Sequence, residues 1–164
     1  MSEKADTIYT IIENKRKKTF SDWDTAYNTI KTELESLILS IDDIKTIPNP
    51  QFQDLTLKFY CIHLCNFFYF HVRKVLVTRN SGTDIEKLLT NGFSNTSNTP
   101  SEPVMNDILS YLITEEEKLS KLKEEYKKIR ELRHKYAHGD SSGTSFSITT
   151  DEFKSIYNDI SSLS

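Results

Sequence analysis

The sequence is poor in the two residue types that most often interrupt helices. Only four glycines and four prolines occur in 164 residues, against eight tyrosines and nine phenylalanines. Because glycine and proline punctuate strand-and-turn architectures, their scarcity favours long helices. A chain of this length is most simply one domain with a substantial core. We therefore expect residues 1–164 to form a single, mostly helical domain.

Cysteine is scarce as well, which excludes a disulfide framework. The two cysteines, Cys61 and Cys65, are four residues apart and would share one apolar face of a helix. His63 would project from a different face, so core packing is favoured over metal binding. We expect neither a metal ion nor a cofactor.

No apolar run in the sequence is long enough to span a membrane. The most apolar stretch, residues 59–77, is interrupted by five polar or charged side chains: His63, Asn66, His71, Arg73 and Lys74. The N-terminal residues do not form a basic-then-apolar signal sequence. We therefore expect a cytoplasmic protein without a membrane partner.

Apolar residues recur at the helical period along most of the chain. The pattern predicts a helix that starts after Ser21 and runs to Ile44, before Pro48 and Pro50. Further helices are predicted over 3–16, 51–79, from Thr83 to about Asn91, over 101–138 with an interruption near Thr114, and over 151–163 after a Thr149–Glu152 cap. Residues 94–101 should form a loop. The sequence predicts an all-α, up-and-down bundle of four to five principal helices, with 51–79 central or facing another subunit.

The formal net charge of −3 conceals a basic segment. From Lys118 to His138 there are eight Lys or Arg residues and three Glu residues, a balance of 8 − 3 = +5, which leaves −3 − 5 = −8 for the remainder. A basic helix on an acidic body is typical of a local phosphate contact. The alternative is a solvated helix face without a ligand.

The basic helix ends in the stretch from Arg130 to Asp140, where two arginines and two histidines lie within nine residues. His134 and His138 are four residues apart and share a face, with Arg130 one turn earlier. Arg133 lies roughly 140° around the helix from His138. Leu132 and Tyr136 should hold the helix against the bundle, so that Arg133, His134 and His138 fall towards its flanks.

Arg133, His134 and His138 resemble the signature of the HEPN superfamily, in which an Arg and a polar residue are followed by a His four to six residues after the Arg. The order of the predicted helices resembles this family as well. The resemblance implies metal-independent cleavage of RNA, single-stranded or tRNA, by a homodimer whose two motifs face each other. It also implies a role as a toxin with an antitoxin partner, or as an effector of antiviral defence.

The residue types suit this chemistry. Histidine transfers protons near neutral pH, which suits His138 as acid or base, and the guanidinium of Arg133 suits the phosphate. His134 would orient the phosphate or share the proton transfer. The RNA-binding candidates around them are Lys127, Arg130, Lys135 and Tyr136. Toxins of this kind that are silenced by a partner nucleotidyltransferase carry a Tyr where this chain has Asp140, so that regulation is not predicted.

Two other functions remain open. The chain could be a non-catalytic helical interaction module of the same fold, which binds RNA or a protein whether or not His138 is present. It could also be a structural bundle in which Arg133 and His138 pair with Glu residues. A metal hydrolase is disfavoured because the sequence has no ligand cluster at metal-binding spacing, no phosphate-binding glycine loop and no nucleophile elbow.

Overall fold

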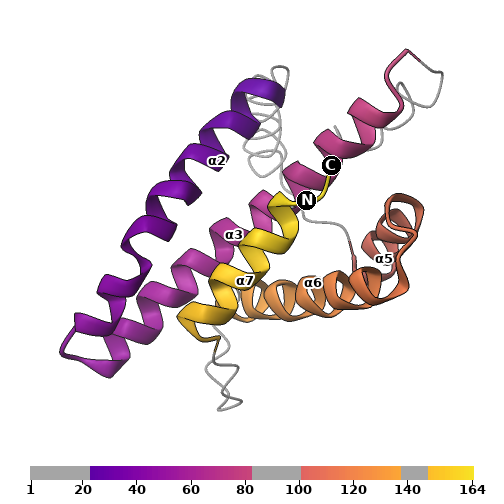
Figure 1. Ribbon diagram of the computed structural model, residues 1–164. Coiled ribbons are helices and arrows are strands. Elements are labelled where there is room, and N and C mark those ends of the chain that lie inside the picture. Colours follow the sequence, from indigo (N-terminus) through magenta and orange to yellow (C-terminus); the bar gives the residue numbers. More distant parts are fainter. Residues whose placement is uncertain (1–22, 83–100, 138–147) are drawn as a thin grey trace, which may run out of the picture.

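The computed structural model describes residues 23–82, 101–137 and 148–164 (Figure 1). Within these ranges every regular element is a helix: α2 (Trp23–Ser40), the 3-10 helix η1 (Ile41–Thr46), α3 (Pro50–Arg79), α5 (Glu102–Leu112), α6 (Glu116–Ala137) and α7 (Thr150–Ser161). The predicted all-α bundle is confirmed. The helices predicted over 3–16 and from Thr83, and the loop over 94–101 except for Ser101, lie outside the described residues.

Two helices begin at the caps that their sequences indicate. The Asn49 side chain accepts a hydrogen bond of 2.9 Å from the backbone N–H of Gln51 at the start of α3, and Pro50 occupies the first turn, where no N–H donor is needed. The Thr149 hydroxyl accepts a bond of 3.1 Å from the backbone N–H of Glu152. The cap predicted for the last helix is therefore present.

The helix predicted to run to Ile44 is divided in two. α2 ends at Ser40, and the chain continues as η1, which still buries Ile41 and Ile44. The hydroxyl of Ser40 donates to the carbonyl of Leu37 at 3.2 Å, so it satisfies a backbone acceptor at the helix end. The apolar period predicted the burial correctly but not the tighter winding.

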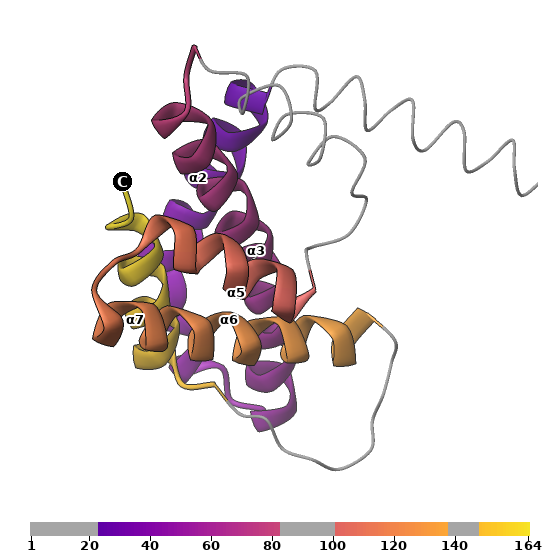
Figure 2. The ribbon, with the colours of Figure 1, turned by 90° about the vertical axis from the view of Figure 1, so that its right-hand side faces the viewer.

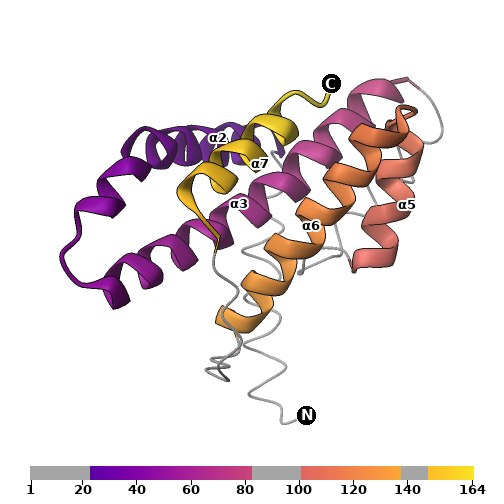
Figure 3. The ribbon, with the colours of Figure 1, turned by 60° about the horizontal axis from the view of Figure 1, so that its bottom comes forward.

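α3 is the centre of the bundle, between α2 and α7 on one side and α6 and α5 on the other (Figure 3). Contacts between aromatic rings show which helices lie next to α3. Phe67 packs on Tyr27 of α2 and Tyr157 of α7, with ring centroids 6.1 and 5.6 Å apart. Phe68 packs on Tyr126 of α6 at 5.0 Å. Figure 2 shows α5 running back along α6 as an antiparallel pair.

The cysteines pack in this core, as predicted. Cys61 and Cys65 are fully buried and form no disulfide, and burial raises the pKa of the Cys61 thiol to about 12. Among the described residues, no group of three or more His, Cys, Asp or Glu side chains could hold a metal ion. No helix in the same ranges is long and apolar enough to cross a membrane.

Candidate functional site

The basic residues of α6 are divided between two sides of the helix. On one side, Lys121 forms an ion pair of 2.9 Å with Asp159, and Lys128 forms an ion pair with Glu152. Both carboxylates belong to α7. These two lysines contribute to the basic excess of the sequence, but α7 neutralises them.

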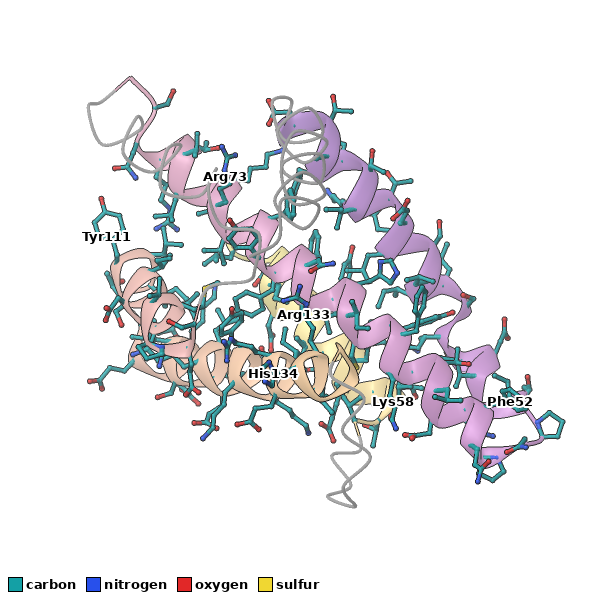
Figure 4. All side chains as sticks on the ribbon, turned by 180° about the vertical axis from the view of Figure 1, so that it is seen from behind. Phe52, Lys58, Arg73, Tyr111, Arg133 and His134 are labelled. Carbon is teal, nitrogen blue, oxygen red and sulfur yellow. The ribbon has the colours of Figure 1, made fainter. Side chains whose placement is uncertain are left out.

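The opposite side of α6 carries a row of cationic residues and one histidine. Residues nine apart on a helix point in opposite directions, so Arg130 faces away from Lys121 and from α7. The residues on this side follow one another at spacings of four, three and four, and we call them the α6 cation row: Lys123, Lys127, Arg130 and His134. Lys127 and His134 are exposed, whereas Lys123 and Arg130 are half-buried. In Figure 4, α7 lies behind α6, and His134 is labelled on α6.

Arg133 does not lie on the flank of α6, contrary to the expectation from the sequence. It follows the buried Tyr126 by seven residues and therefore points nearly the same way. Its side chain is half-buried and lies between α6 and α3 (Figure 4). The apolar positions of α6, at spacings of three and four, are Leu119, Leu122, Tyr126 and Ile129. The fully buried Leu132 continues this series, and Arg133 directly follows it.

A cavity of about 440 Å³ lies between α6 and α7, and most of its ionisable residues are acidic. Its lining includes Glu124, Glu125, Glu131 and Glu152, with Lys127 and Lys128. Burial, followed by a hydrogen bond with Asp159, raises the pKa of Glu125 to about 8. Negative charge therefore predominates in this cavity, although Lys127 of the α6 cation row also lines it.

The structure brings together only part of the predicted site. The last three turns of α6 carry four of the predicted residues: Lys127, Arg130, Arg133 and His134. His138 lies outside the described residues, as do the side chains of Lys135 and Tyr136. Sequence reasoning missed Lys123 as a member of the row, although its spacing of four, seven and eleven residues from Lys127, Arg130 and His134 would have indicated it.

The fold is that of an all-α bundle with a cationic helix side. A family model described as RiboL-PSP-HEPN matches residues 25–164, which include all of α3, α5, α6 and α7. The chain therefore belongs to the HEPN superfamily, and the stretch from Arg133 to His138 lies inside the match. No curated protein and no solved structure matches the chain.

Proposed function

We propose that this protein is a HEPN-type endoribonuclease that cleaves RNA without a metal ion. The observation that carries the proposal is the separation of charge on α6. Within the α6 cation row, Arg130 faces away from α7, while Lys121 and Lys128 on the other side of the helix are neutralised by α7. The RNA backbone is a polyanion, so it is attracted to the row and repelled by the carboxylates of the α6–α7 cavity.

The proposed reaction is an intramolecular transfer. A base removes the proton of a ribose 2′-OH, the 2′-oxygen forms a bond to phosphorus, and the bond from phosphorus to the 5′-oxygen breaks. An acid protonates that 5′-oxygen, leaving a 2′,3′-cyclic phosphate. We assign the proton transfers to His138, with His134 orienting the phosphate or sharing them. The guanidinium of Arg133 would stabilise the charge on the phosphoryl oxygens.

The half-buried position of Arg133 suits this role. A side chain held between two helices keeps one orientation, which a charge-stabilising group requires. Arg133 and His138 are roughly 140° apart on an ideal helix. Two-fold pairing of two chains would supply both groups to one phosphate, so we propose a homodimer with a composite site. The RNA on either side of the cleaved bond would be bound by Lys127, Arg130, Lys135 and Tyr136. A toxin or an antiviral effector would have this cleavage activity.

The test is cleavage of labelled single-stranded RNA and of total tRNA in EDTA. Wild type should leave cyclic-phosphate ends, and Arg133→Ala and His138→Ala should each lose cleavage by about 100-fold or more. Lys121→Ala is the matched control, because it removes a cation from the α7 side of the same helix. Intact RNA with all four proteins folded and dimeric would contradict the nuclease. Binding of RNA or a protein that survives His138→Ala would then favour the interaction module.

A further inference from the structure

Two lysines of α6 are paired with carboxylates of α7 and point away from His134. Lys128 pairs with Glu152, and Lys121 pairs with Asp159 at 2.9 Å. The two lysines are seven residues apart, so they lie in line along one side of the helix. On an ideal helix they lie roughly 120° and roughly 140° around from His134, which follows them by six and thirteen residues. A phosphate bound by these lysines would therefore lie on a different side of α6 from His134.

The two ion pairs lie at the surface and are not what holds α7 in place. Lys128 and Glu152 expose 32% and 43% of their side chains. Exposed ion pairs contribute little to the stability of a fold. α7 is held on the core by its buried apolar side chains: Phe153, Ile156 and Ile160. The main effect of the two carboxylates is therefore to cancel two charges that a polyanion would otherwise bind.

Lys127 and Lys128 are neighbours in the sequence but differ in their partners. Lys127 precedes His134 by seven residues, so it points within about 20° of it, and it lies about 100° around the helix from Lys128. Among the described residues no carboxylate forms an ion pair with Lys127, although its side chain lines the acidic cavity. The border of the positively charged surface of α6 thus runs between Lys127 and Lys128, and Glu152 sets it.

We propose that Glu152 and Asp159 are positioning residues for the RNA. By neutralising the two lysines that they contact, they keep the RNA backbone on the side of α6 that carries His134. The proposal rests on the proposed function and adds what excludes a second, unproductive way of binding. Attraction between a cation and a phosphate carries no information about register or orientation, so a helix with free cations all round would bind RNA in several ways.

The first experiment measures binding of a short, fully 2′-O-methylated RNA, which lacks the attacking hydroxyl and stays intact. Glu152→Gln should tighten binding roughly three-fold at low salt, because it frees the cation of Lys128. The gain should disappear in the double variant Lys128→Gln/Glu152→Gln, because no cation is then freed. Of the two adjacent lysines, Lys127→Gln should weaken binding roughly three-fold, and Lys128→Gln should weaken it less.

The control variant is Asp42→Asn. It changes the net charge by the same amount and breaks an ion pair of 2.8 Å with Lys154 of α7, but it lies on η1, so it should leave RNA affinity unchanged. Glu152→Gln keeps the backbone N–H that donates to Thr149 at the start of α7, and melting curves verify that both variants are folded.

The second experiment separates positioning from a general effect of charge. A short RNA occupies one side of α6 at a time, so an unproductive site competes with the productive one. Glu152→Gln should then lower KM and kcat for cleavage by the same factor, roughly three-fold, and leave kcat/KM at the wild-type value. A residue that only supports the fold would not produce this pattern.

Three outcomes overturn the proposal, and they differ in what else they overturn. Equal affinities of Glu152→Gln and Asp42→Asn, with wild type binding and cleaving RNA, overturn the positioning role alone. A higher kcat/KM in Glu152→Gln also overturns it, because the freed Lys128 would then serve productive binding. Absence of binding and cleavage in wild type contradicts the proposed function and the positioning role together.

Discussion

The hydroxyl of Tyr27 donates a hydrogen bond to Nδ1 of His71, and the two atoms are 2.7 Å apart. The direction follows from the other ring nitrogen, Nε2, which lies 2.7 Å from the carbonyl oxygen of Leu163. A carbonyl only accepts, so Nε2 carries the hydrogen and Nδ1 of the neutral ring is the acceptor. His71 thus joins α2, α3 and the residues after α7. Burial is the main reason why the pKa of His71 is lowered.

Tyr27→Phe should lower the free energy of unfolding by about 1–2 kcal/mol, because Nδ1 of His71 would remain buried without a donor. The amine of Lys74 lies 4.2 Å from the centroid of the Tyr27 ring, and this contact survives in the variant. Urea denaturation measures the change. Tyr157→Phe is the control, since its hydroxyl makes a bond of 3.5 Å to exposed Glu35. Equal losses in the two variants would contradict a special role for the buried bond.

His71 should make the protein less stable in acid. The unfolded imidazole takes up a proton near pH 6.5, whereas the folded one does so only at lower pH because its pKa is lowered. The unfolded state then binds more protons, and the free energy of unfolding falls as the pH drops below 6.5. The stability difference between wild type and His71→Gln should therefore shrink between pH 7.5 and 5. A difference that stays constant over this range would show that His71 does not titrate differently on folding.

Glu125 should make the protein less stable as the pH rises, whereas His71 makes it less stable as the pH falls. Its pKa rises from 4.5 to about 8 in the folded protein, so the folded carboxyl keeps a proton that the unfolded one has lost. The free energy of unfolding consequently falls as the pH rises from 4.5 to about 8. Glu125→Gln, which mimics the protonated group beside Asp159, should melt above wild type at pH 9 and equal it at pH 5.

The control for this experiment is Glu124→Gln, which removes an exposed carboxylate from the same helix and measures the effect of charge alone. The compared quantity is the difference in melting temperature between Glu125→Gln and wild type. If this difference is the same at pH 5 and at pH 9, it contradicts a proton held between Glu125 and Asp159.

Arg133→Leu should abolish cleavage while changing the free energy of unfolding by no more than about 1 kcal/mol. Arg133 is half-buried and points nearly the same way as the buried Tyr126, so an apolar side chain fits this position without desolvating a charge. Arg130→Leu is the control, because it adds an apolar side chain on the cation row and should not stabilise the fold. Destabilisation of Arg133→Leu by more than about 1 kcal/mol would mean that Arg133 serves the fold, as in a purely structural bundle.

The local features of the fold could be predicted closely from the sequence. The helix boundaries at Pro50, Thr149 and the interruption near Thr114 come from caps, from proline and from the break in the apolar period, all of which act over a few residues. Burial of Cys61 and Cys65 was predictable for the same reason. Among the described helices, the change from α2 to η1 was missed, because an α-helix and a 3-10 helix of six residues bury the same side chains.

The sequence by itself determined which residues share a helix face, because the 3.6-residue period fixes it. It could not determine which face another helix would cover. α3 is apolar nearly all round, so only the packing of α2, α6 and α7 decided that Phe67 and Phe68 are buried while Phe52 and Phe59 stay exposed. Likewise, only the contacts with α7 separated the neutralised lysines of α6 from the α6 cation row, since ion pairs between distant segments leave no period in the sequence.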